Sequence, residues 1–220
     1  MPTPKLEIVV VTPFQQNCQI LWDEETKRGI VVDPGGDVPK ILDRVRANGV
    51  TIEAILLTHG HLDHAGGAAE LRDALPALAD GSHVPVIGPD KRDAFLLTGI
   101  SKQAAEYGIP AMHDVTPDRY LEEGDELSYA GCRLKVLHVP GHTPGHIVFI
   151  EEARRFGLVG DTLFQGSVGR TDFPYCDGAR LIADVKSKLL TLGDDMAIVP
   201  GHGPGSTIGE ERRTNPFLVR

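Results

Sequence analysis

Short apolar runs alternate along the chain with longer segments in which apolar residues recur at helical spacing. Runs typical of β-strands cover residues 5–11, 17–22, 29–35, 52–58, 85–89, 124–131, 132–140, 146–152, 155–161 and 196–200. Helical periodicity covers residues 37–49, 64–79, 90–108, 179–193 and 209–217. The third helical segment has a break near Gly99. The pattern predicts a mixed α/β fold, which some schemes would class as α+β.

Composition narrows the picture without naming a function. No low-complexity linker divides the 220 residues, so we expect a single domain over residues 1–220. No apolar run approaches the ~18–20 residues of a membrane span, and the N-terminal segment lacks a signal-peptide pattern. The three cysteines are widely spaced and predict no disulfide framework, which favours a reducing cytoplasm.

The net charge of −9 argues against a nucleic-acid partner, because phosphate binding needs concentrated positive charge. An anionic small-molecule substrate would have to be attracted locally, by a metal ion or by a few Arg and Lys side chains. The sequence leaves the oligomeric state open.

Residues of the kind that bind metals follow four of the predicted strands. His59, His142, Asp161 and His202 each stand within two residues of the end of a buried-looking strand. Ligands of α/β proteins bind beyond the carboxyl ends of strands, where loops vary over a rigid base. We therefore expect these side chains to gather in one place.

The segment HGHLDH at 59–64 holds three imidazoles and a carboxylate within six residues. A protein core does not tolerate this density without charged or metal partners. His59 and His61 point to the same side of an extended segment, whereas Asp63 and His64 begin the next turn and face a second point. Seven nitrogen or oxygen ligands without cysteine favour an open, dinuclear, hydrolytic site, with metals about 3.5–4 Å apart.

The other histidines have different expected roles. His138 lies inside a predicted strand and His83 and His113 lie in loop-like stretches, so we expect structural and surface positions for them. His146 opens the strand after His142, too far along the chain to share its metal. We expect its side chain to contact the metal-binding residues rather than the metal itself.

The motifs THGHLDH, PGHTPGH, GDTLF and PGHG occur in this order and resemble those of the metallo-β-lactamase superfamily. The segment GDTLFQGSVGRTDFP at 160–174 and the terminal ERRTNPFL are similar to those of its glyoxalase II-like branch, the hydroxyacylglutathione hydrolases, and most of all to the short bacterial type II glyoxalases. The resemblance implies a four-layer αββα sandwich with the metals at one edge of its two sheets.

The resemblance also implies how the ligands are shared. Two divalent metal ions are implied, zinc first, with iron or manganese as alternatives. The first would be held by His59, His61 and His142, the second by Asp63, His64 and His202, with Asp161 bridging both. Asp63 would also have a catalytic role, because it would orient the attacking hydroxide.

The implied reaction is hydrolysis of S-D-lactoylglutathione-like thioesters, by attack of a metal-bridged hydroxide, to glutathione and a hydroxy acid. The longer members carry a C-terminal helical domain that grips glutathione, but only 18 residues follow His202, so we expect that domain to be absent. Where those enzymes use a Lys and a Tyr, this chain has Arg170 and Asp172. Arg170 either meets a glutathione carboxylate or pairs with Asp172 to hold its own loop.

A rival activity belongs to the same superfamily. Persulfide dioxygenases share the GRTDF loop and use one iron, at positions that match His59, His142 and Asp161. His146 stands where those enzymes tend to lack histidine, which favours the hydrolase. A non-catalytic metal-binding protein and a phosphodiesterase are weaker alternatives. The segment 90–112 either forms a lid over the site or packs against the sheet.

Overall fold

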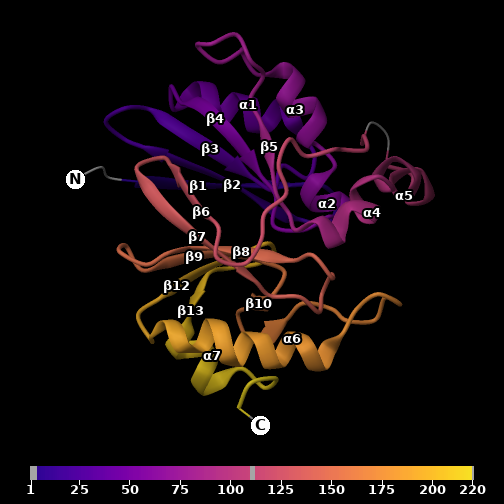
Figure 1. Ribbon diagram of the computed structural model, residues 1–220, viewed down its shortest axis with the longest axis vertical. Helices are drawn as coiled ribbons and strands as arrows, with labels where there is room; N and C mark the ends of the chain where they lie inside the picture. The colour runs from indigo at the N-terminus through magenta and orange to yellow at the C-terminus, as the bar shows by residue number, and fades with distance from the viewer. Residues whose placement is uncertain (1–3, 110–111, 220) are drawn as a thin grey trace.

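Two β-sheets lie face to face in the middle of the molecule, and helices cover the outer face of each (Figure 1). The computed structural model describes residues 4–109 and 112–219. The layers run helix, sheet, sheet, helix, so the predicted αββα sandwich is confirmed.

The N-terminal half of the chain forms the first sheet, with five strands in the order β1-β2-β3-β4-β5. The strands are β1 (Pro4–Val11), β2 (Gln16–Asp23), β3 (Arg28–Val32), β4 (Thr51–Leu56) and β5 (Val86–Ile87). The first three strands are antiparallel, whereas β3, β4 and β5 are parallel and need crossover connections. Helix α1 (Val38–Ala47) makes the first crossover, and α2 (Leu62–Ala65) and α3 (Ala68–Ala74) lie in the second.

The C-terminal half forms the second sheet, with six strands in the order β13-β12-β9-β8-β7-β6. The strands are β6 (Glu126–Tyr129), β7 (Cys132–His138), β8 (Ile147–Glu151), β9 (Phe156–Gly160), β12 (Ala197–Pro200) and β13 (Ser206–Thr207). Strands β9 and β12 are parallel, and the crossover between them carries α6 (Gly178–Asp184), the π-helical turn η2 (Val185–Leu189) and the 3-10 turn η3 (Leu190–Leu192). Helix α7 (Ile208–Thr214) follows β13.

Two smaller groups of elements follow strands β5 and β9. The turn η1 (Lys91–Asp93) and helices α4 (Ala94–Leu97) and α5 (Ile100–Glu106) follow β5, with the predicted break at Gly99. A two-stranded hairpin of β10 (Leu163–Phe164) and β11 (Ser167–Val168) follows β9, and the hydrophobic pattern did not predict it.

Apolar side chains fill three layers between these elements. The first layer lies between the first sheet and its helices and includes Ile20, Val31 and Leu71. The second lies between the sheets and includes Leu56 and Phe149. A third layer packs α6 and α7 on the second sheet. Alternate residues of one strand serve different layers, since Val148 belongs to the third layer and Phe149 to the second.

The single helix predicted over residues 64–79 is wrong in extent. Helix α2 ends at Ala65, α3 begins after Gly67, and residues 75–79 are not helical. The Gly67 N–H donates to the Pro34 carbonyl oxygen at 2.9 Å instead of continuing the helical hydrogen bonds, and a Cβ on Gly67 would lie 2.7 Å from that oxygen. The backbone of Leu75 is extended, as the ring of the following Pro76 favours.

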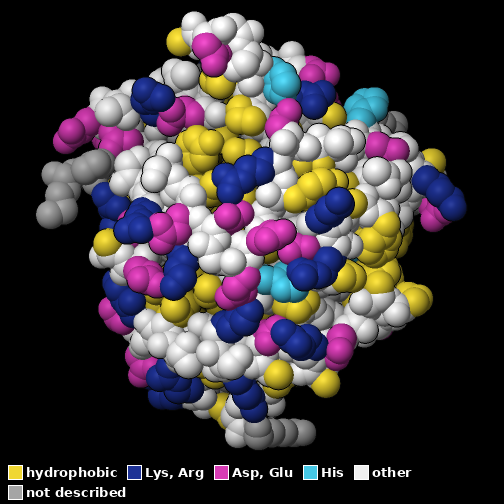
Figure 2. Space-filling view, viewed as in Figure 1, with side chains coloured by type: hydrophobic (Ala, Val, Ile, Leu, Met, Phe, Trp, Pro, Cys, Tyr) yellow, Lys and Arg dark blue, Asp and Glu magenta, His cyan; other side chains and the backbone are white. Residues whose placement is uncertain are grey.

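Two further observations concern the charged side chains of the surface and the character of the helices. Basic and acidic side chains are interspersed on the face drawn in Figure 2. Ion pairs on the surface of the protein include Arg133–Glu126. Within residues 4–109 and 112–219, none of the helices combines the length and the apolar character needed to cross a membrane.

The layer between the sheets makes a stability prediction. Phe149 is fully buried there, whereas Phe217 is half exposed near the chain end. We expect Phe149→Ala to lower the free energy of unfolding by about 3–5 kcal/mol, because it leaves a cavity that the two sheets cannot close. Phe217→Ala is the matched control and should change it by less than about 0.5 kcal/mol in urea unfolding. Equal effects of the two variants would contradict this packing.

Candidate metal centre

The predicted metal-type residues meet at one edge of the sandwich. His59 and His61 lie in the loop after β4, and Asp63 and His64 lie in α2. His142 lies in the turn between β7 and β8, while Asp161 and His202 follow β9 and β12. Because β9 and β12 are parallel and adjacent, their carboxyl ends bring the last two residues together.

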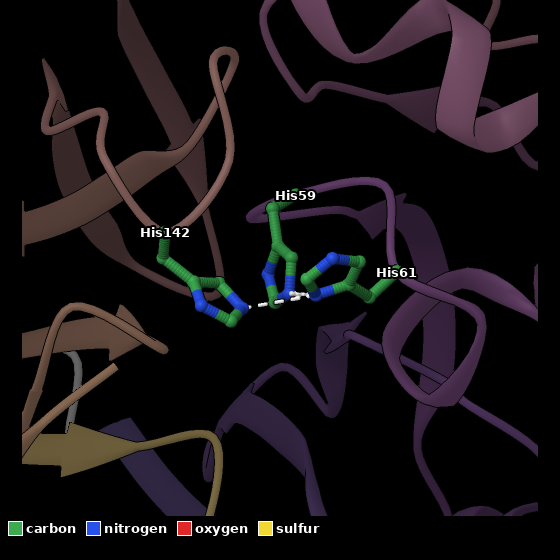
Figure 3. Close-up of side chains that lie close together, drawn as sticks. All are labelled: His59, His61 and His142. Carbon is green, nitrogen blue, oxygen red and sulfur yellow. Dashed lines mark hydrogen bonds between the residues drawn. The ribbon is translucent and has the colours of Figure 1, made fainter. Parts of the chain in front are cut away.

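Three of the histidines converge on one point (Figure 3). His61 Nδ1 lies 3.1 Å from His59 Nε2 and 2.9 Å from His142 Nε2. All three side chains are buried. Two belong to the first half of the chain and one to the second, so only the folded sandwich assembles this cluster.

The chemistry of this first cluster fits a metal ion. Burial, together with neighbouring imidazoles, lowers the pKa of His59 well below its usual value and that of His61 to about 3. Burial likewise lowers the pKa of His142. The rings are therefore neutral at neutral pH, and their facing nitrogens offer lone pairs. A divalent cation satisfies three neutral imidazole nitrogens at such a point.

A second cluster of possible ligands lies beside the first. His202 Nε2 is 3.2 Å from Asp63 Oδ2 and 3.4 Å from His64 Nε2. Asp63 and His202 are partly exposed, whereas His64 is buried. Burial opposes the charged form of His64, but the carboxylates of Asp161 and Asp63 outweigh it and raise its pKa. The cluster thus holds negative charge that a cation can neutralise.

The carboxylate of Asp161 stands between the two clusters. Its Oδ2 lies 3.6 Å from His142 Nε2 in the first cluster and 3.6 Å from His202 Nε2 in the second. Its Oδ1 lies 3.3 Å from His64 Nε2. Burial favours the neutral acid, but the surrounding histidines, His64 above all, lower the pKa of Asp161. An ionised carboxylate in this place can bridge two cations.

A buried carboxylate orients one histidine of each cluster. Asp33 Oδ2 accepts hydrogen bonds from His64 Nδ1 at 2.9 Å and from the Thr58 hydroxyl at 2.6 Å. The Thr58 hydroxyl in turn accepts from His59 Nδ1 at 3.0 Å. Both outer nitrogens therefore carry hydrogen, which leaves each Nε2 free to bind a metal. Asp33 and Thr58 lie near the ends of β3 and β4, but a lone Asp after an apolar run carries no distinctive signal.

The other three histidines have outer partners as well. His142 Nδ1 donates to the Arg170 carbonyl oxygen at 2.8 Å, and His202 Nδ1 donates to the Phe14 carbonyl oxygen at 3.2 Å. His61 Nε2 lies 2.9 Å from the Tyr175 hydroxyl. Each of the five imidazoles thus has one nitrogen fixed by the protein and one facing the clusters. This arrangement is typical of metal-binding histidines.

The remaining histidines lie as expected. His146 is buried and stacks on His59, and its Nε2 accepts a hydrogen bond from the Asp161 backbone N–H at 3.0 Å. His138 Nε2 donates to the Pro144 carbonyl oxygen at 2.8 Å, which holds the turn that carries His142. His83 and His113 are exposed.

A cavity of about 390 Å³ opens onto both clusters. Its floor includes His61, Asp63, His142, Asp161 and His202. Its walls come from the loop after β1, helix α5, the β10–β11 hairpin and the following loop, through Phe14, Gln103, Tyr107, Phe164, Val168, Arg170 and Phe173. The pattern predicted neither Phe14 nor the hairpin as part of the site.

Two sequence expectations about the walls can now be compared with the structure. Arg170 donates two hydrogen bonds to Asp172, at 2.7 and 2.6 Å, so the pairing that holds its own loop is present. The guanidinium also lies 4.5 Å from the Phe173 ring centre and lines the cavity. Within the segment 90–112, Gln103 and Tyr107 face the cavity while Leu97 and Ile100 are core residues, and 110–111 lie outside the described residues.

The role of Asp33 generates a prediction. Asp33→Asn keeps a residue that tolerates the positive φ of 51° but turns one acceptor oxygen into a donor. We expect metal affinity to fall about 10- to 100-fold, since His59 and His64 lose their fixed tautomers. Competition with a chelator measures it. Asp37→Asn is the matched control, because Asp37 also has a positive φ, of 48°, but is exposed. Equal metal retention by both variants would refute this role.

Known proteins are similar to this chain in sequence and in fold. The model of the metallo-beta-lactamase superfamily matches residues 11–202. The hydroxyacylglutathione hydrolase GloC of Haemophilus influenzae is 44% identical over 214 residues, which is 97% of each chain.

Solved structures of other proteins have the same fold as this chain. A crystal structure of TTHA1623 in a di-iron-bound form has a TM-score of 0.83 at 39% identity and covers 96% of this chain and 100% of that one. The BLEG-1 B3 metallo-beta-lactamase has a TM-score of 0.87 at 30% identity and covers 98% and 100%. ETHE1 from Myxococcus xanthus, with a TM-score of 0.78, is 22% identical over 98% of this chain and 85% of that one, a likeness of fold alone. With its His and Asp clusters at the edge of an αββα sandwich, the chain belongs to the metallo-beta-lactamase superfamily.

Proposed function

We propose that the chain is a metal-dependent thioester hydrolase of the glyoxalase II type, which cleaves S-D-lactoylglutathione-like substrates to glutathione and a hydroxy acid. The ligand sets are His59, His61 and His142 for one divalent ion, and Asp63, His64 and His202 for another. The observation that carries the proposal is the position of the Asp161 carboxylate, within 3.6 Å of histidines of both sets. Zinc is the first candidate metal, with iron or manganese as alternatives; one relative holds two irons.

A bound metal pair lowers the pKa of a water molecule toward ~7 and so supplies a hydroxide nucleophile at neutral pH. The residues of the chain prepare its attack. Burial favours the protonated Asp63, but His64 and His202 outweigh this and lower its pKa. The ionised carboxylate lines the cavity, where it can accept a hydrogen bond from the nucleophile and orient it.

The substrate class follows from the leaving group. A thiol has a pKa of about 8.5, so a thiolate departs without a strong proton donor. Burial lowers the pKa of His61 and His142, and neither neutral ring serves as a general acid. Burial also raises the pKa of Tyr175, which stands against His61. A thioester is the acyl substrate that least needs an acid in this cavity.

Persulfide dioxygenation by a single iron is the less favoured activity. It would use His59, His142 and Asp161 alone, and would give Asp63 and His202 no role. These two side chains nevertheless face each other across 3.2 Å in the cavity. Hydrolysis gives both of them a function, and the 44% identical relative bears a hydrolase name.

Metal analysis and two assays on one preparation test the proposal. We expect about two metal ions per chain and release of thiol from S-D-lactoylglutathione. One iron per chain, with oxygen consumed on glutathione persulfide and no thioester cleavage, would overturn it.

Replacing His202 separates the two activities. We expect His202→Ala to lose one metal ion per chain and to lower kcat/KM for the thioester by at least about 100-fold, because the second ligand set is broken. A mono-iron enzyme should largely survive the change. His83→Ala is the control, since that imidazole is exposed and, within residues 4–109 and 112–219, hydrogen-bonds to Asp118 away from both clusters. Unchanged metal content and activity in His202→Ala would reject the ligand set.

Arg170 makes a separate prediction about substrate binding. We expect Arg170→Ala to raise KM for S-D-lactoylglutathione by up to about tenfold with little change in kcat, because the guanidinium meets a glutathione carboxylate. Asp172→Ala tells this role from loop support. It frees the guanidinium, so KM should stay or fall if Arg170 binds substrate. A rise in KM in both variants would mean that their ion pair only holds the loop.

A further inference from the structure

Asp93 is a buried carboxylate outside the two ligand sets. It ends the turn η1 and precedes helix α4, and its side chain has no exposed surface. Its Oδ2 accepts hydrogen bonds from the Gly60 backbone N–H at 2.9 Å and from the Thr143 hydroxyl at 2.7 Å. Its Oδ1 accepts from the Gly145 backbone N–H at 2.5 Å.

The three donors belong to the two loops that carry the first ligand set. Gly60 stands between His59 and His61, and Thr143 directly follows His142. The first loop leaves the first sheet and the second leaves the other sheet, so one carboxylate joins ligand loops that the fold brings in from opposite layers. The 2.9 Å between His61 Nδ1 and His142 Nε2 depends on how these loops are spaced.

The loops lie in close contact with the turn that carries Asp93. A Cβ on Gly145 would come within 2.6 Å of the Asp93 backbone nitrogen. A Cβ on Gly60 would come within 3.0 Å of the Asp93 carbonyl oxygen. The backbone of both loops is therefore fixed against η1 on either side of the carboxylate, with little room for a shift of either loop.

We propose that Asp93 is a positioning residue that sets the spacing of the His59–His61 loop and the His142 loop, and through it the affinity of the first metal site. The proposal rests on the ligand sets of the proposed function. A backbone hydrogen bond from Ile147 N to the Thr58 carbonyl oxygen, 2.8 Å long, joins the same two loops. Loss of Asp93 therefore alters their spacing without separating the sheets.

The isosteric variant Asp93→Asn exposes this role. An amide has one acceptor oxygen and one donor NH₂, whereas all three partners of Asp93 donate. Whichever way the amide turns, its NH₂ faces at least one N–H or O–H, and that loop must move away. Thr143→Val removes only the hydroxyl donor, whereas Thr143→Ser retains it.

The test measures metal retention in the His202→Ala background, where the first ligand set is complete and the second is broken. Each protein is loaded with Co²⁺, dialysed against a graded chelator series, and analysed for retained cobalt and its absorption spectrum. We expect Asp93→Asn to weaken retention about 10- to 100-fold, Thr143→Val less, and Thr143→Ser less than about twofold. Asp90→Asn is the matched control, because that carboxylate bonds to Arg92 within the same turn.

Two results would overturn the proposal. One is the same cobalt retention in Asp93→Asn and Thr143→Val as in the parent. The other is a loss confined to Asp93→Asn together with an earlier melting of its metal-free form, which would mean a general loss of stability. Substrate takes no part in this measurement. If the unmodified protein fails to cleave S-D-lactoylglutathione but the retention series holds, the proposed function fails and the positioning role stands.

Discussion

The gathering of five imidazoles around two points, four of them buried, is the constraint on which the rest of the site depends. Removing these rings from water disfavours their protonated forms, and several of them lie within 3.5 Å of one another. A cation between them would satisfy the lone pairs that face each other. Each outer nitrogen must then find an acceptor in the protein, and in each of the five it does.

This constraint explains why the site stands where the two halves of the chain meet. A local segment such as HGHLDH supplies four of the seven metal-type residues, but its own geometry cannot close either set. His142, Asp161 and His202 must arrive from strands of the second sheet. The two sheets therefore have to pack in a fixed relation, and the apolar layer between them, around Phe149, holds that relation.

The sequence predicts which residues gather in the two clusters better than it predicts the residues that support them, for a physical reason. A metal-type residue just after an apolar run is visible in one dimension, and the structure brings all seven such residues to one edge. Asp33, Asp93 and Tyr175 lack a local signal, because each acts on a loop far from it along the chain. The prediction of one helix over 64–79 was wrong for a related reason. The Gly67 N–H bonds to Pro34, which is distant along the chain, and the periodic pattern carries no sign of this contact.

The two proposed ligand sets differ in burial, and the difference bears on how firmly each would hold an ion. His59, His61 and His142 are all buried, and the carboxylates of Asp33 and Asp93 support the loops that carry them. Asp63 and His202 are partly exposed at the cavity floor. The outer nitrogen of His202 is held by one backbone group within the described residues, the Phe14 carbonyl oxygen. An ion in the proposed first set would have to break its bonds to three buried side chains, whereas in the proposed second set water could replace an exposed ligand. The first set would therefore hold its proposed ion more firmly than the second, because its three side chains are all withdrawn from water.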